Sequence, residues 1–300
     1  MAIKWQGVMP AITTCFNEDL TIDHAFQARH VGWLIDHGCT GIVTPGSLGE
    51  GATLTFEEKR ALWKTSVGAA GSRAPVVAAI AALSTAEAVE LAKSAQGSGC
   101  EGLMVLPPYV YKSDWREMKA HVEAVFRATK LPCMLYNNPV AYGTDFLPEQ
   151  IQELAAENEN FGSVKESSTD VRRVAAIRAL TGERLAVLVG VDDAIVEAIA
   201  LGATGWIAGL VNAMPAESVA LVNYARANDA AKTFELYRWF LPLLRMDTVP
   251  KFVQLIKLVQ QAVGMGNARV RPPRLELAGA ELSQAQAVIR RALETRPALS

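Results

Sequence analysis

The sequence lacks the features by which nucleic acids, membranes and secretion pathways are recognised. Its 300 residues contain no dense run of lysine and arginine, and the formal net charge is only −2. Nucleic acid and anionic lipid select basic patches, so we expect neither as a main partner. No run of about 18 apolar residues occurs, and the first residues do not resemble a secretory leader. We expect a cytoplasmic protein whose partner is a small molecule.

Cysteine and histidine are scarce and scattered. The cysteines form no CxxC pair, which argues against a zinc site and against a disulfide framework. The histidines fall in stretches of helical periodicity, where we expect surface residues and not bases. The cysteines are Cys15, Cys39, Cys100 and Cys133, and the histidines are His24, His30, His37 and His121.

Short apolar runs alternate with longer amphipathic stretches along most of the chain. Half of the residues are apolar and a fifth are charged, which is a globular composition. Repeated strand–helix units of this kind are typical of a parallel sheet. The apolar runs are 7–14, 41–44, 75–81, 102–107, 132–136, 161–165, 185–190 and 205–210.

Eight such units predict a (β/α)₈ barrel, a TIM barrel. Strand-like runs stop before residue 215, so we expect the barrel core over 1–215. Over 216–300 we expect the last barrel helix and a C-terminal helical extension packed on the barrel. An open doubly wound sheet is the alternative, but it would favour a G-x-G-x-x-G motif after the first strand, and none is present.

The residues that close each predicted strand are candidates for a site, because barrel enzymes place their chemistry at the carboxyl ends of the strands. No histidine is among them and they show no metal-ligand spacing, so we expect no metal and no cofactor. Asp192 and Asp193 are interpreted as an N-cap with favourable charge, not as metal ligands. The candidates are Ser47, Glu50, Tyr109, Tyr111, Tyr136, Lys165, Gly190 and Ile207.

Lys165 ends the apolar run FGSVK and is followed by ESSTD. A lysine at a strand end commonly reaches to solvent. In a barrel mouth, however, loss of water lowers the pKa of the amine, and a neutral amine attacks carbonyl carbon to form a Schiff base. The iminium then acidifies the adjacent carbon, and a neighbouring hydroxyl must move the proton. Tyr136, on the preceding predicted strand, is placed to do this.

Four segments in order, GSLGE, YNNP, VKESS and GATGWIAGLVNAMP, closely resemble the dihydrodipicolinate synthase / N-acetylneuraminate lyase superfamily. The resemblance covers essentially the whole chain. It implies that Lys165 forms the Schiff base, that Tyr136 relays protons, and that Ser47 links this relay to the bound carboxylate. Backbone amides of Ser47 and Leu48 would hold that carboxylate.

The resemblance also implies pocket and assembly features. Gly190 and Ile207 match positions that line the pocket, whereas Glu50 is expected to be mainly structural. Such enzymes are commonly homotetramers, dimers of dimers, in which a tyrosine is lent by a neighbouring subunit. Val110 stands at that position here, although Tyr109 or Tyr111 could substitute for it.

Two departures concern the substrate. Ser47 and Leu48 stand where dihydrodipicolinate synthases usually have two adjacent threonines. Ala141 stands where those enzymes have an arginine that binds the second carboxylate of the substrate. A substrate with one carboxylate leaves no charge unpaired in such a site. We therefore favour a 2-oxo acid or cyclic imine carboxylate, with 1-pyrroline-4-hydroxy-2-carboxylate deaminase as the preferred activity on the likeness of YNNPVAYG and YRWFLPLL.

Several alternatives stay open. The same lysine and tyrosine serve a 2-keto-3-deoxy sugar acid dehydratase, a pyruvate-releasing aldolase, or 4-hydroxy-tetrahydrodipicolinate synthase. A phosphate-binding barrel enzyme would need glycine-rich loops after the last two strands, where GVDDA and AGLVN are poor candidates. A non-catalytic binder on the same fold is the alternative from another class.

Overall fold

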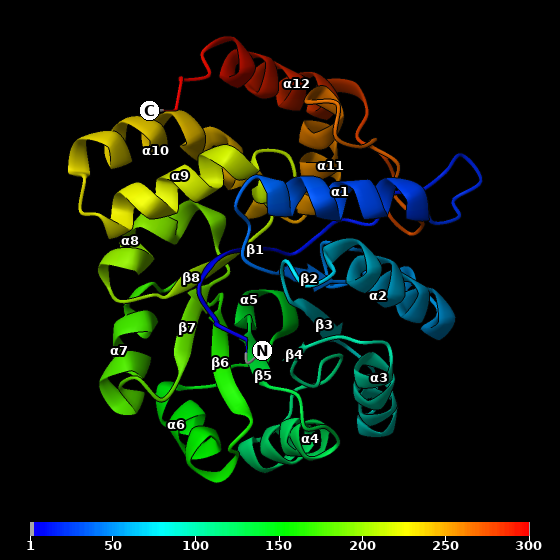
Figure 1. The fold of residues 1–300 in the computed structure, drawn as a ribbon, viewed down its shortest axis with the longest axis vertical. Helices are drawn as coiled ribbons and strands as arrows, with labels where there is room; N and C mark the ends of the chain where they lie inside the picture. Colours follow the sequence, from blue (N-terminus) through cyan, green and yellow to red (C-terminus); the bar gives the residue numbers. More distant parts are fainter. Residues whose placement is uncertain (1–2, 300) are drawn as a thin grey trace.

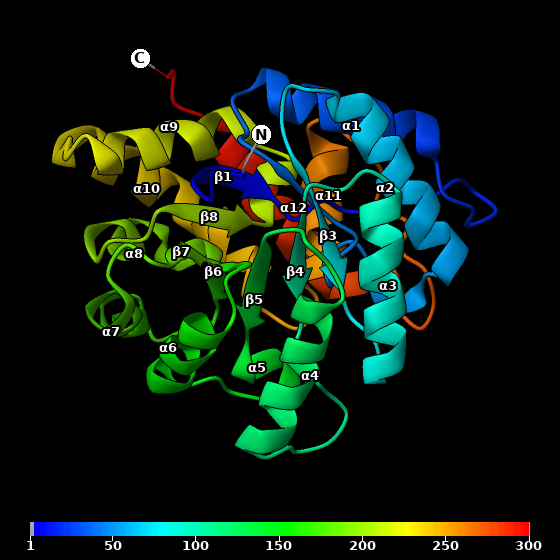
Figure 2. The same cartoon turned by 60° about the horizontal axis from the view of Figure 1, so that its bottom comes forward.

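The computed structural model describes residues 3–299 and contains one eight-stranded parallel sheet rolled into a barrel (Figures 1 and 2). Adjacent strands pair in the order β1-β8-β7-β6-β5-β4-β3-β2, and a bridge between Ala11 and Val43 brings the first and second strands together. The predicted (β/α)₈ barrel is confirmed. The strands are β1 (Gly7–Pro10), β2 (Ile42–Thr44), β3 (Val76–Ile80), β4 (Gly102–Val105), β5 (Cys133–Asn137), β6 (Phe161–Glu166), β7 (Ala186–Val189) and β8 (Gly205–Ala208).

Alternate residues of the strands enter two different cores. Met9 and Val43 point into the barrel, whereas Val8 and Ile42 pack outward against the helices. Because both faces are covered, the strands are apolar throughout and do not alternate between apolar and polar residues. This is why they appear in the sequence as uninterrupted apolar runs.

The helices follow the strands and surround the barrel (Figure 1). Local signals fix several of their ends: Thr55 and Glu58 form a capping box, as do Asp114 and Glu117. The helices are α1 (His24–Asp36), α2 (Phe56–Ala70), α3 (Thr85–Gly97), α4 (Trp115–Arg127), α5 (Pro139–Tyr142), α6 (Pro148–Glu157), α7 (Arg172–Thr181), α8 (Ile195–Ala200), α9 (Pro215–Arg226), α10 (Ala230–Leu244), α11 (Phe252–Ala262) and α12 (Gly279–Glu294).

After β8 the described chain contains helices and no further strand. Helix α9 packs against β1 and α8 as the last barrel helix, and α10 to α12 form the predicted extension beside it (Figure 1). Four single 3₁₀ turns complete the elements. They are η1 (Gly51–Thr53), η2 (Asp192–Ala194), η3 (Leu210–Asn212) and η4 (Arg245–Asp247).

A buried ion pair joins the extension to the barrel. Lys257 of α11 lies 2.5 Å from Glu50, which follows β2, and both side chains are almost completely buried. Lys257 also donates to the carbonyl oxygen of Arg269, while Glu50 accepts from the backbone amide of Arg271. Glu50 is therefore structural, in line with the expectation from sequence.

Two expectations about polar residues are wrong. His30 and His121 are buried, not on the surface: His30 bonds to the carbonyl oxygen of Asn212, and His121 to the hydroxyl of Thr85. Asp192 is not an N-cap either, because α8 starts only at Ile195. In residues 3–299 no helix is both long and apolar enough to cross a membrane.

Candidate active site

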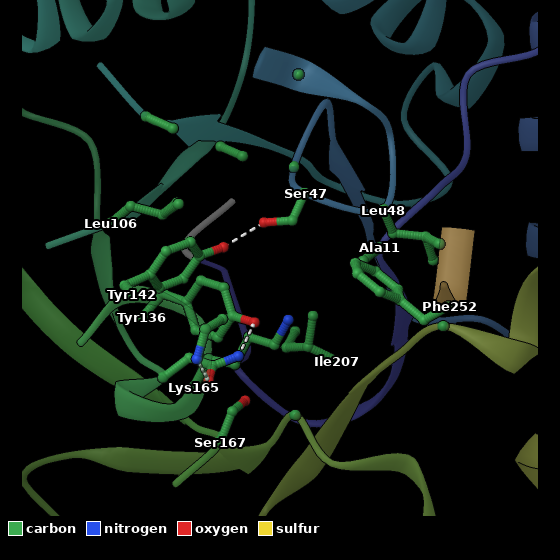
Figure 3. A pocket seen from close by; sticks show the side chains of 18 of the residues that line it. Ala11, Ser47, Leu48, Leu106, Tyr136, Tyr142, Lys165, Ser167, Ile207 and Phe252 are labelled. Carbon is green, nitrogen blue, oxygen red and sulfur yellow. Dashed lines mark hydrogen bonds between the residues drawn. The ribbon is translucent and has the colours of Figure 1, made fainter. Parts of the chain in front are cut away.

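A cavity of about 530 Å³ opens at the carboxyl ends of the strands. It brings together residues from the ends of β2, β5, β6 and β8 (Figure 3). Gly190 after β7 and the turn between α10 and α11 line it as well. Its size is that of a small-molecule site. Lys165, Tyr136, Ser47, Leu48, Gly190, Ile207 and Tyr109 all line it.

Lys165 is buried at the end of β6 and points into the cavity. Its Nζ lies 4.0 Å from the centre of the Tyr136 ring, and no carboxylate within residues 3–299 forms an ion pair with it. Burial lowers the pKa of the amine to about 8, against the opposing influence of Asp247 and Asp192. A substantial fraction of this amine is therefore neutral near physiological pH.

Tyr136 lies beside Lys165 because β5 and β6 pair in a register that sets these two residues opposite each other. Its hydroxyl accepts a hydrogen bond from Nδ2 of Asn138, at 3.0 Å. Burial raises the pKa of Tyr136 to about 12, and the bond from Asn138 opposes that rise. The phenol is thus protonated and aimed at the same space as the amine.

The Ser47 hydroxyl is hydrogen-bonded to the hydroxyl of Tyr142, at the end of α5 (Figure 3). The Tyr142 ring in turn meets the Tyr136 ring edge-on, with centroids 5.7 Å apart. Burial raises the pKa of Tyr142. Sequence reasoning gave Tyr142 no role; the only signal was a hydroxyl-bearing aromatic residue close after the YNNP turn.

The turn after β2 contributes Ser47 and Leu48 to the lining of the cavity. Within residues 3–299, no hydrogen bond uses the amide of Ser47 or of Leu48. The turn is folded tightly, since a Cβ at Gly49 would stand 2.8 Å from the carbonyl oxygen of Ile12. Free amides in such a turn form a binding place for a carboxylate.

Of the remaining residues predicted for the site, all but Tyr111 line the cavity. A Cβ at Gly190 would stand 2.3 Å from Cε of Lys165 and 2.1 Å from Oγ of Ser167, so only glycine leaves room for the lysine. Ile207 and Leu48 are buried walls, and Tyr109 packs near the Tyr142 ring. Tyr111 is exposed and does not line the cavity of this single chain.

Two carboxylates near Lys165 were not predicted as site residues. Asp192 is fully buried and accepts from the amides of Gly209 and Leu210 and from Nε1 of Trp206. Burial raises its pKa to about 6. Asp247 lines the cavity from η4. No local pattern marks either residue, because the folding of η3 and η4 over the strand ends creates their surroundings.

The cavity lining contains two cations that the sequence argument did not foresee. Lys59 and Arg274 both line it, although Ala141 stands where an arginine was sought. Ala141 lines the cavity at the position expected from the sequence, and the C-terminal segment adds Arg274 to the lining. No group of three or more histidine, cysteine, aspartate or glutamate side chains suited to a metal occurs among the described residues.

The lowered pKa of Lys165 predicts the pH dependence of its reaction with a ketone. Only the neutral amine attacks carbonyl carbon, so trapping of pyruvate on Lys165 should accelerate as pH rises through about 8 and then level off. The measurement is the initial rate of adduct formation with cyanoborohydride between pH 6 and 10. A rate still rising tenfold per pH unit above pH 9 would contradict it.

The sequence and fold were compared with known proteins. The dihydrodipicolinate synthetase family matches residues 4–292. The chain belongs to this family. It is 32% identical over 269 residues to 4-hydroxy-tetrahydrodipicolinate synthase from Agrobacterium fabrum, covering 90% of this chain and 92% of that protein. The members of this dihydrodipicolinate synthetase family are enzymes, so the chain is an enzyme of that group.

Solved structures of the family agree over nearly the full length. The 4-hydroxy-tetrahydrodipicolinate synthase from Methylacidiphilum fumariolicum has a TM-score of 0.93 at 26% identity, with 97% of each chain covered. A prophage protein of the dihydrodipicolinic acid synthase family from E. coli K12, solved in complex with pyruvate, has a TM-score of 0.91 at 28% identity. It covers 96% of this chain and 99% of that one.

Proposed function

We propose that the chain is a lysine Schiff-base lyase that acts on a 2-oxo acid or a cyclic imine carboxylate. One observation carries the proposal: a buried amine without a paired carboxylate lies 4.0 Å from the ring of a protonated tyrosine in the cavity. Simple binding of an anion needs a cation, not an amine whose pKa is lowered toward neutrality. A non-catalytic binder is therefore the weaker reading.

The first steps follow from the arrangement. The substrate carboxylate binds the free amides of Ser47 and Leu48, which directs its carbonyl carbon to Nζ of Lys165. Attack forms a C–N bond, and Tyr136 supplies the proton with which the carbonyl oxygen leaves as water. The resulting iminium withdraws electrons from the adjacent carbon, whose proton Tyr136 then accepts.

Tyr142 and Ser47 extend this proton path within the same chain. Tyr142 is bonded to Ser47 and lies close enough to Tyr136 that each influences the pKa of the other. A proton taken up by Tyr136 can thus be passed through Tyr142 to Ser47 beside the bound carboxylate. No hydroxyl from Tyr111 or from a second subunit is needed for this path.

The preferred reaction is deamination of 1-pyrroline-4-hydroxy-2-carboxylate. Lys165 adds to C2 and the ring nitrogen departs as an amine, so the ring opens. The 4-hydroxyl leaves as water with a proton from C3, which forms a C3=C4 double bond. Proton shifts from C5 to C3 and from the nitrogen to C4 then convert the terminal amine into an imine, and hydrolysis of this imine and of the lysine imine consumes two waters. The net reaction takes up one water and yields ammonia and 2-oxoglutarate semialdehyde.

The same imine on Lys165 could also lead to three other reactions, which are tested together with the deamination. Relatives of the chain are named 4-hydroxy-tetrahydrodipicolinate synthase, and Arg274 and Lys59 supply cations that a second carboxylate could use. Dehydration of a 2-keto-3-deoxy sugar acid and aldol release of pyruvate use the same lysine and tyrosine.

A substrate screen separates these activities. Purified protein is incubated with the hydroxy-pyrroline, with 2-keto-3-deoxy sugar acids, and with pyruvate plus aspartate semialdehyde. Ammonia, 2-oxoglutarate semialdehyde and pyruvate are then measured. Ammonia from the hydroxy-pyrroline at a kcat/KM above that of every other substrate supports the deaminase. Faster condensation of pyruvate with aspartate semialdehyde would overturn it.

Removal of the Tyr142 hydroxyl tests the proton path. Tyr142→Phe should lower kcat by about 10² because a positioned proton donor contributes that much, while the pyruvate adduct on Lys165 still forms. Tyr224→Phe, on α9 at the outside of the barrel, is the matched control and should leave kcat unchanged. An unaltered kcat in Tyr142→Phe would show that the path runs elsewhere.

We propose that the chain assembles as a homotetramer, a dimer of dimers. The support is four exposed apolar side chains in the segments that follow β3, β4 and β5, at the same end of the barrel: Leu83, Val110, Tyr111 and, in α5, Val140. Light scattering on the purified protein tests the state. A cytoplasmic location stays a prediction.

A further inference from the structure

Asp247 is the acidic residue of the cavity to which neither the Schiff-base chemistry nor the proton path gives a role. It ends η4, between α10 and α11, and this turn folds back over the carboxyl ends of the barrel strands. A Cβ at Gly209, which follows β8, would stand 2.0 Å from Oδ1 of Asp247. The carboxyl group thus lies directly against the backbone at the end of β8, and glycine is needed there.

The carboxyl group has hydrogen-bonding capacity that the described chain does not use. Its Oδ1 is buried and has no hydrogen-bond partner, and no arginine, lysine or histidine within residues 3–299 forms an ion pair with it. A buried acceptor left without a donor is costly, and native structures seldom retain one without a reason. A second polar group beside the lysine is in the same condition: Ser167 is 3% exposed and its Oγ lacks a partner.

The electrostatic surroundings determine which ligand group suits this position. Asp192 and Asp193 surround Asp247 with like charge, and Lys165 opposes them. Burial, with Asp192 as the next cause, raises the pKa of Asp247 well above its ordinary value. Another carboxylate placed here would need proton uptake, whereas a neutral hydroxyl could donate to the carboxyl oxygen in either protonation state.

We propose that Asp247 is a specificity-determining residue, whose carboxyl group accepts a hydrogen bond from a hydroxyl on the substrate carbons beyond the carbonyl and disfavours a second carboxylate there. The inference rests on the proposed Schiff base, since Lys165 fixes the carbonyl end of the substrate. It assigns the hydroxyl-bearing part of the substrate to the β8 side of the cavity. Arg274 and Lys59, which also line the cavity, are not assigned to this part of the substrate.

The test compares three acids that share a five-carbon skeleton: 2-oxopentanoate, 4-hydroxy-2-oxopentanoate and 2-oxoglutarate. For each acid we measure the concentration that gives half-maximal borohydride-trapped label on Lys165 by mass spectrometry, counting adducts of cleavage products as well. For the wild type, the half-maximal concentration of 4-hydroxy-2-oxopentanoate should be about tenfold lower than that of 2-oxopentanoate, since a site built to bond a hydroxyl discriminates strongly. The half-maximal concentration of 2-oxoglutarate should be the highest of the three.

Two variants separate charge from hydrogen bonding. Asp247→Asn keeps an acceptor, so it should retain part of the hydroxyl preference while the penalty on 2-oxoglutarate falls about tenfold. Asp247→Ala should lose both effects. Because selectivity is a ratio within one variant, a general change in Lys165 reactivity cancels. Asp193→Asn, which removes a nearby charge paired with Arg245, is the control and should keep the wild-type ratios.

Each result decides the matter. Equal half-saturation of the wild type by the three acids, tightest binding of 2-oxoglutarate, or unchanged ratios in both Asp247 variants would overturn the assignment to Asp247. The same change in Asp193→Asn would overturn it too, because a general field would then be the cause. Failure of pyruvate itself to label wild-type Lys165 would overturn the Schiff-base proposal and this inference with it.

Discussion

Replacement of Lys165 by alanine is expected to abolish borohydride-trapped pyruvate on the protein and to lower kcat by at least about 10⁴, since loss of a covalent nucleophile removes the reaction path itself. The amine is buried in the lining of the cavity, and Gly190 leaves room for it. Among the described residues that line the cavity, Lys59 on α2 carries the other amine, and we expect it not to replace Lys165. Mass spectrometry of the trapped protein and steady-state kinetics measure the two effects.

The control for charge is Lys165→Arg, which keeps a cation at the same place but cannot form an imine. It should be as inactive as Lys165→Ala. Binding of the carboxylate to the Ser47 and Leu48 amides should survive in both variants, so competitive binding of a non-reactive carboxylate can be used to show an intact site. Pyruvate label that persists on another lysine in Lys165→Ala would refute the assignment.

Disruption of the Glu50–Lys257 pair is expected to be the largest effect on stability. Lys257→Met leaves the Glu50 carboxylate buried, and within residues 3–299 its remaining partner is the Arg271 amide. Glu50→Gln leaves the ammonium group with the Arg269 carbonyl oxygen and the face of the Phe16 ring, 4.5 Å away. An uncompensated buried charge costs about 3–5 kcal/mol, so each variant should lower the free energy of unfolding by that amount. Urea unfolding followed by circular dichroism measures it.

The exposed pair between Lys251, at the start of α11, and Glu281 of α12 is the matched control, because it is a lysine–glutamate pair of the same extension. Exposed pairs contribute at most about 1 kcal/mol, so Lys251→Met should scarcely move the urea midpoint. The double variant Glu50→Gln/Lys257→Met removes both charges and should be more stable than the sum of the single changes implies. Equal, small shifts in the buried and the exposed pair would contradict this account.

The strands could be predicted from the sequence because parallel strands in a barrel are buried on both faces. All eight apolar runs coincide with strands, although the first run, 7–14, is a strand only over Gly7–Pro10. The pairing of Tyr136 with Lys165 also followed, since consecutive strands of a barrel are neighbours. Which helical residues are buried was less predictable: the apolar periodicity of the sequence did not show that His30 lies on the buried side of α1.

The sequence by itself determined the strand order, the placing of the lysine and the tyrosine at the same barrel end, and the family. These depend on local periodicity and on chain order. Only the tertiary structure decided that Tyr142 bonds to Ser47, that Asp192 holds the backbone after β8, and that Asp247 and Arg274 enter the cavity. Loops and turns bring these groups together from positions up to hundreds of residues apart, and no repeating pattern records which side chains will meet.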